Sequence, residues 1–304
     1  MCCFAQEVKD VHSTKIFARI TEDGQQVLAY SMKYDSEVPN AMILPLPTTG
    51  REDSLEFIDL SGYERFFDDL QRGFPKVQSL LSRALPMARV DSAVKQDLKV
   101  HKVGSFVASF VPTVKDFSRL DPQFVIPAET WQSVDGYDGF GFAVFQLDEK
   151  AGKTHPMAMR FETSLKDQVF FPTLHIHDGE IHKSEKFDHY LFMQHAGMDS
   201  VVGSYAGPKK TQSRTGMVRS KNPVRDFAKP DKSAGLLEPD LLLHRKRMSG
   251  NLPNRDEIFR VAGHPTKVSF NIAPWLKIAP MALAATGLAW IIGRRTKLLR
   301  EAKK

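Results

Sequence analysis

The first 195 residues alternate between short apolar runs and clusters of turn-forming residues, and this pattern most limits what the chain can fold into. Residues 14–20 and 26–34 are typical of two strands, and the sequence Glu-Asp-Gly at 22–24 supplies a turn between them. Further strands are expected at 41–46, 55–59, 98–111, 139–147, 155–163, 169–177 and 188–194. Strands and helices do not alternate regularly, so the order favours an antiparallel sheet or sandwich over a parallel α/β fold.

A few short helices are expected between these strands. Apolar residues from Tyr63 to Leu70 recur at helical spacing, and Gly73 and Pro75 then end the segment. Other short helices are expected at 78–89, 114–120 and 128–134. The predicted fold class is α+β, with a mainly antiparallel β-sheet or sandwich and short helices. A basic C-terminal arm with one hydrophobic helix is expected to follow.

Charge divides the chain near residue 200. Residues 1–200 hold 21 Lys and Arg against 29 Asp and Glu, whereas residues 201–304 hold 21 against 7. We therefore expect an acidic domain over 1–198, a basic linker or partly ordered arm over 199–272, and a hydrophobic helix with a basic tail over 273–304. A basic arm suits a membrane surface, a nucleic acid or an acidic partner, or it could fold back on its own acidic domain. Aromatic residues for base stacking are scarce between 201 and 270, which argues against nucleic acid.

The last part of the chain carries a short hydrophobic segment. Sixteen uncharged residues lie between Lys277 and Arg294, and as a helix they would span about 24 Å, less than the roughly 30 Å hydrocarbon core. Trp275 and Trp290 are suited to a membrane interface, and Arg294 and Arg295 begin a basic flank that can reach lipid head groups. The segment predicts a single-pass tail anchor, although the positive-inside rule opposes moving that flank across a membrane. The alternative is a helix that docks on protein.

The chain opens without a basic region followed by an apolar leader. We therefore expect a membrane-associated protein whose main domain stays on the side of synthesis, cytoplasmic or on an organelle surface, and is not secreted.

A histidine-rich stretch between residues 174 and 182 is the strongest local motif. Asp178 and Gly179 lie between alternating runs and predict a two-residue hairpin turn. Strand alternation would place four donors on one face, with opposed positions about 5 Å apart. Three imidazoles and a carboxylate suit a divalent transition metal such as zinc. The predicted metal ligands are His175, His177, Glu180 and His182, and His189 is a further candidate. The alternative is an ordinary hairpin with a solvated face.

The chain has two cysteines, Cys2 and Cys3, which are too close in sequence to join distant parts of a fold. If Met1 is removed, Cys2 would carry an α-amine able to act as its base, as in N-terminal-nucleophile hydrolases. The glycine after the cysteine and the His-Arg-Gly motif of the amidotransferase branch are absent. Two alternatives stay open: a cysteine joins the histidines at a metal, or both are simply buried.

Three segments together resemble a bacterial protein family of unknown function. They are Met-Cys-Cys-Phe at 1–4, Ala-Met-Ile-Leu-Pro-Leu-Pro at 41–47 and Phe-Phe-Pro-Thr-Leu-His-Ile-His-Asp-Gly-Glu-Ile-His at 170–182. The resemblance covers about residues 1–195. Because that family has no established activity, the resemblance implies no catalytic residues.

The first function expected is a membrane-associated accessory or binding protein, such as a subunit of a membrane complex. It would contact lipid or a membrane protein through residues 273–304. The alternative is a metal-binding protein or metal-dependent enzyme that uses the His/Glu cluster. A further alternative is a hydrolase acting through Cys2, and no other catalytic residue is indicated.

Overall fold

The computed structural model describes residues 2–74, 100–127, 130–131, 137, 139–147, 155–207, 214–261 and 265–268. Contacts divide the chain into two units, Met1–Lys267 and Val268–Lys304, and only Val268 of the second unit is described. The expected hydrophobic helix lies outside the described residues, together with Trp275, Trp290, Arg294 and Arg295. Within the described ranges, no helix is long and apolar enough to cross a membrane.

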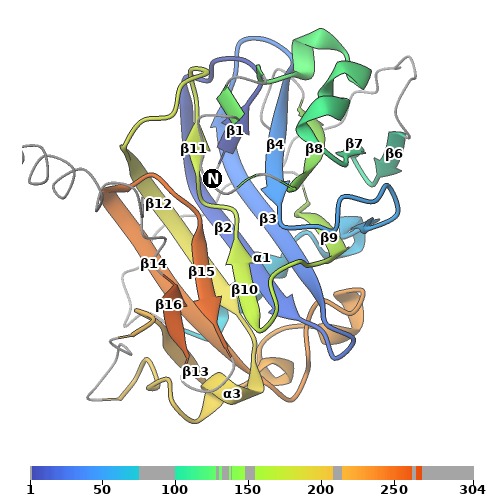
Figure 1. The fold of residues 1–304 in the computed structure, drawn as a ribbon. Helices are drawn as coiled ribbons and strands as arrows, with labels where there is room; N and C mark the ends of the chain where they lie inside the picture. Colours follow the sequence, from blue (N-terminus) through green and yellow to red (C-terminus); the bar gives the residue numbers. More distant parts are fainter. Residues whose placement is uncertain are drawn as a thin grey trace, which may run out of the picture. The chain divides into compact units, whose positions relative to one another are not determined.

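The first unit is built on a seven-stranded mixed sheet (Figure 1). Its strands, in spatial order, are β13 (Val218–Pro223), β14 (Leu242–Pro253), β12 (Ser184–Met193), β2 (Asp10–Ile20), β3 (Gln25–Asp35), β9 (Met157–Glu162) and β5 (Leu55–Ile58). Strands β2 and β3 form the predicted hairpin, and Gly24 turns the chain with a φ of 79°. Successive residues in the middle of both strands are buried, because this sheet is covered on both faces.

A six-stranded sheet lies against one face of the seven-stranded sheet. Its order is β11 (His175–Ile176), β1 (Cys2–Phe4), β4 (Asn40–Leu46), β8 (Gly141–Leu147), β7 (Phe106–Val111) and β6 (Val100–Val103). Two ring contacts join the sheets, Phe4 with Tyr34 at 6.3 Å and Phe57 with Phe145 at 5.4 Å between centroids. A third sheet consists of β10 (Gln168–Phe171), β15 (Glu257–Arg260) and β16 (Thr266–Val268).

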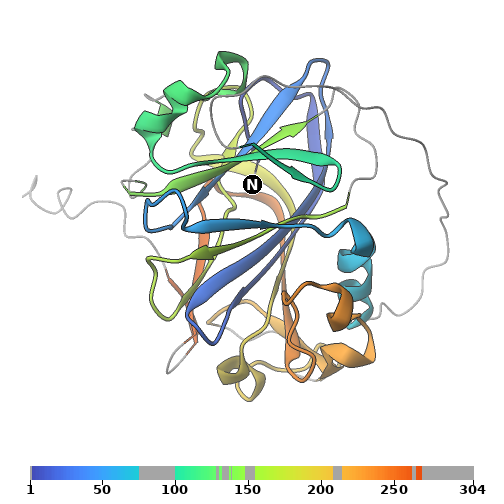
Figure 2. The same ribbon diagram turned by 90° about the vertical axis from the view of Figure 1, so that its right-hand side faces the viewer.

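Helical segments cover the other face of the seven-stranded sheet. Helix α1 (Phe66–Arg72) lies beside the 224–237 segment there (Figure 2). Phe66 packs edge-on against Phe17 of β2 at 5.7 Å, and Leu236 belongs to the same buried cluster. Further short helices among the described residues include α3 (Ala196–Asp199) and 3-10 turns at Ser61–Tyr63, Val114–Arg119, Pro122–Phe124, Val224–Asp226 and Pro230–Lys232.

The described part is thus a mainly β fold with mixed sheets and few short helices. Most strands expected over the first 195 residues are present where the structure describes those ranges, but the single strand expected at 169–177 is two strands, β10 and β11, in different sheets. Two pairings are parallel, β1 with β11 and β2 with β12, and the sequence did not predict them. Each pairing joins two segments that are far apart in sequence, and local sequence patterns cannot reveal contacts of that range.

The expectation of a linker or partly ordered arm over 199–272 does not hold for the described part of that range. Strand β14 pairs with β12 along ten residues, from Ser184 opposite Pro253 to Met193 opposite His244. Strand β15 pairs with β10 in the same antiparallel manner. Strand β14 was not predicted because its basic residues are typical of a solvated arm. In the structure they lie over aromatic rings: the Arg245 guanidinium is 4.2 Å from the Phe74 ring centroid.

A chain that ends at residue 198 is expected not to fold. Truncation there removes β14 from the edge of β12 and β15 from the edge of β10, and it removes Leu236 and Leu243 from the core. A chain ending at residue 268 keeps every described strand and should unfold cooperatively. Urea unfolding followed by circular dichroism checks both chains; a cooperative transition in the shorter one would contradict the expectation.

His244 of β14 should make the fold sensitive to acid. Its side chain is fully buried; Nδ1 lies 3.3 Å from the Met193 carbonyl and Nε2 lies 3.3 Å from Asp199 Oδ1. Burial lowers the pKa of His244 from 6.5 to about 4. The unfolded chain therefore binds a proton more readily, and stability is lost as the pH falls from about 6.5 toward 4, by up to about 1.4 kcal/mol per pH unit.

The contribution of His244 is isolated by the variant His244→Gln. Urea unfolding at pH 7, 6 and 5 should give a shallower loss of unfolding free energy for this variant than for the wild type. Asp199, Arg219 and His195 also influence this position, and they are unchanged in the comparison. Equal slopes in the two proteins would show that His244 does not titrate in this range.

Candidate functional site

Three histidines meet where β11 and the residue after it pack on β12. His175 lies in β11, His177 follows that strand, and His189 is in the middle of β12. His175 Nε2 is 3.1 Å from His189 Nε2, and the imidazole of His177 stacks on that of His175 with centroids 4.9 Å apart. His175 and His189 are each 3% exposed. His175 and His189 therefore lie in the interior, while His177 is partly buried.

Glu185 adds a carboxylate to this cluster. It lies on β12 two residues before Phe187 and four before His189, so strand alternation directs all three to the same face. One ligand atom from each of His175, His177 and Glu185 lies within 4.8 Å of the other two. The Phe187 ring lies 4.4 Å from the His175 ring and forms an apolar wall beside the donors.

Burial keeps the imidazoles of this cluster neutral. It lowers the pKa of His177 to about 4 and holds the pKa values of His175 and His189 well below their ordinary value. A neutral imidazole has a nitrogen lone pair, which is the form that binds metals. His175 Nδ1 and His177 Nε2 are buried and have no hydrogen-bond partner among the described residues. Buried nitrogens without partners are costly, so these atoms favour an additional ligand.

Strand β1 places the N-terminal cysteines next to this cluster along the backbone. Cys2 is in parallel register with His175, and Cys3 is in register with Ile176. The Cys3 side chain is fully buried, and its Sγ lies 3.8 Å from the Leu174 carbonyl oxygen. Simple burial therefore accounts for Cys3, while a nucleophilic role for Cys2 stays a prediction.

Glu180 and His182 are not part of the cluster, contrary to the hairpin prediction. Both are exposed, and His182 Nε2 pairs with Asp178 Oδ2 at 2.9 Å. The chain does turn at Gly179, with a φ of 85°, but β11 ends at Ile176 and pairs in parallel with β1. No ladder therefore forms across the turn.

Glu185 was not among the predicted ligands, although the sequence holds a signal for it. The expected strand at 188–194 begins four residues earlier in the structure, at Ser184. Extending its alternation backwards from His189 places Glu185 on the buried face. His189 contacts His175 but is not one of the three residues whose ligand atoms converge, so its role as a further ligand stays a prediction.

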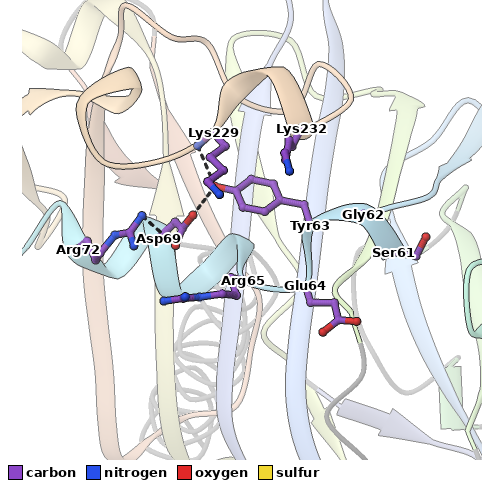
Figure 3. Close-up of a pocket in the computed structure, with 9 residues that line it drawn as sticks. All are labelled: Ser61, Gly62, Tyr63, Glu64, Arg65, Asp69, Arg72, Lys229 and Lys232. Carbon is purple, nitrogen blue, oxygen red and sulfur yellow. Dashed lines mark hydrogen bonds and ion pairs between the residues drawn. The ribbon is translucent and has the colours of Figure 1, made fainter. Parts of the chain in front are cut away.

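A concavity of about 290 Å³ lies between α1 and the 229–232 turn, away from the histidine cluster (Figure 3). The Tyr63 hydroxyl donates to Asp69 Oδ2 at 3.0 Å and accepts the Lys229 backbone N–H at 2.8 Å. Arg72 Nη2 lies 3.0 Å from Asp69 Oδ1. The central polar groups of this concavity therefore bind one another, and they join α1 to the 224–237 segment. The lining residues are Ser61, Gly62, Tyr63, Glu64, Arg65, Asp69, Arg72, Lys229 and Lys232.

Comparison with known proteins gives a fold likeness only. No protein-family model matches the chain, and no curated protein matches it. Among solved structures, baculovirus P35 matches with a TM-score of 0.45 and 13% identity, covering 86% of this chain and 100% of that chain. P35 in a caspase-8/P35 complex matches with a TM-score of 0.45 and 11% identity, covering 83% and 97%. At this level the likeness carries no inference about activity or partners. Membership of the bacterial family suggested by the sequence stays a prediction.

Proposed function

We propose that the protein binds a divalent transition metal ion, zinc in the first instance, through His175, His177 and Glu185. The observation that carries the proposal is the convergence of three donor atoms within 4.8 Å of one another beside buried, unpartnered imidazole nitrogens. Two imidazoles and a carboxylate match the N and O donors that zinc accepts in proteins. Hard cations such as Mg²⁺ prefer all-oxygen sites, which this cluster does not provide.

His189 decides between two kinds of site. In a tetrahedral zinc site with Zn–N bonds of about 2.0–2.1 Å, ligand nitrogens lie about 3.3 Å apart. His175 Nε2 and His189 Nε2 are 3.1 Å apart, which suits this separation only if His175 binds the ion through Nε2 and not through its unpartnered Nδ1. If His189 joins, four protein ligands give a closed structural site. If it does not, three protein ligands leave a position for water, as catalytic zinc sites do.

A bound metal would connect segments that the chain brings together from different sheets. His175 belongs to β11 of the six-stranded sheet, and Glu185 and His189 belong to β12 of the seven-stranded sheet. An ion that binds only the folded state would add about 2.7 kcal/mol of stability at a concentration 100-fold above its Kd. The proposal therefore includes a stabilising role, whether or not the site is also catalytic.

Zinc binding is expected to depend on the clustered residues and not on the neighbouring exposed ones. Full-length protein should bind zinc in a competition titration against a chromophoric chelator, and His175→Ala, His177→Ala and Glu185→Gln should each weaken binding at least about 10-fold, because each loses a donor. Cobalt substitution should give the intense d–d bands of a four-coordinate site.

The matched controls are Glu180→Gln and His182→Ala in the same loop. Both side chains are exposed and lie outside the cluster, so these variants should bind zinc as the wild type does. Equal loss in His182→Ala and His177→Ala would favour the hairpin arrangement instead. No zinc binding by the wild type under metal-replete conditions would refute the proposal.

Membrane association through residues 273–304 stays a separate prediction. The full chain should sediment with membranes, and a chain ending at Leu276 should not, because it lacks the hydrophobic segment and its basic flank. Both chains contain all the metal-site residues, so equal zinc binding by the two provides the control for folding. If both remain in the supernatant, the expected anchor is excluded.

A further inference from the structure

The turn at 254–256 binds three successive backbone amides of the segment that leads into the proposed metal site. Asp256 Oδ1 accepts the N–H of Thr173 at 2.6 Å and that of Leu174 at 2.8 Å. Asn254 Oδ1 accepts the N–H of His175 at 2.7 Å. Side chains of one turn therefore take the place of a neighbouring strand along this edge of β11.

Asn254 also donates a hydrogen bond to His175. Its Nδ2 donates to the His175 carbonyl oxygen at 2.9 Å, so one side-chain amide holds both backbone polar groups of His175. A primary amide presents a donor and an acceptor side by side, which is the complement of a peptide group in a strand. The peptide on each side of His175 is thereby fixed.

The pair of hydrogen bonds between the Asn254 side chain and the His175 backbone, here called the clamp, matters because few strand contacts hold β11 in place. The strand is two residues long, and within the described residues its one strand neighbour is β1, which is three residues long. Asp256 is anchored in turn, since it is 5% exposed and accepts a hydrogen bond from the Tyr137 hydroxyl. The Thr173 hydroxyl closes the arrangement by donating to the Arg255 carbonyl at 2.8 Å.

We propose that Asn254 is a positioning residue for the metal site, holding the His175 backbone so that its imidazole faces Glu185, His177 and His189. The inference rests on the proposed function. His175 is the member of the cluster that contacts both other histidines, so a shift of its backbone would move two contacts at once. Groups that orient metal ligands without touching the ion change affinity by about 10- to 100-fold when removed.

The test compares Asn254→Ala with Gln194→Ala in the full-length protein. Gln194 makes the same pair of bonds to another backbone, donating to the Glu238 carbonyl at 2.8 Å and accepting the Glu238 N–H at 2.9 Å. Zinc affinity is measured by chelator competition, and unfolding free energy is measured in urea without metal. Hydrogen exchange of the His175 amide in the metal-free protein is the third readout.

Asn254→Ala should weaken zinc binding by about 10-fold or more and speed exchange of the His175 amide. Gln194→Ala should lower stability while leaving both zinc affinity and His175 exchange near wild-type values. Unchanged affinity in Asn254→Ala, or an equal loss in both variants, overturns the positioning role while leaving the metal site in place. A wild type that binds no zinc overturns the proposed function and this inference with it.

Discussion

Strand β12 is paired along both edges, and the rest of the described fold depends on this arrangement. Residues His189–Met193 pair in parallel with Thr14–Ala18 of β2, and the whole strand pairs antiparallel with β14. Because side chains alternate between faces, Phe192 enters the core beneath α1 while His189 and Glu185 point to the opposite face. A single strand thus joins the N-terminal and C-terminal parts of the unit and carries Glu185 of the candidate site together with the neighbouring His189.

Much of the fold could be predicted where the chain forms structure with its own neighbours. The β2–β3 hairpin and the region of α1 follow from alternation, from a turn closed by Gly24 and from helical spacing after Tyr63. Strand β14 could not be found in this way, because Arg245, Lys246 and Arg247 give it the composition of a solvated arm. Their charges are accommodated by partners outside the strand: Arg245 lies over the Phe74 ring, and Lys246 Nζ pairs with Glu257 Oε2 at 2.7 Å.

The candidate site, like the fold, could be predicted only where its residues are close together in sequence. His175 and His177 stand out within one short motif, whereas Glu185 becomes a neighbour only when β11 pairs with β1 and not with the strand that follows it. The clamp by Asn254 has no local signal. Similar amide clamps recur at Asn40 with the Gln6 backbone and at Gln26 with the Phe170 backbone. Buried backbone groups must be paired, and these amides pair them where no strand is available.

The parallel pairing of β1 with β11 has a consequence for how the chain reaches this structure. Cys3 and Leu174 are in contact although they are 171 positions apart in sequence. One edge of β2 can pair only after β12, which comes much later in the chain, is available. Contacts of such long range require costly loop closure before they stabilise the fold, so we expect the chain to fold slowly, on the scale of about milliseconds to seconds. During synthesis the β2–β3 hairpin is complete long before its outer edge is covered. An early hairpin with an open edge is a site for wrong pairing between nascent chains.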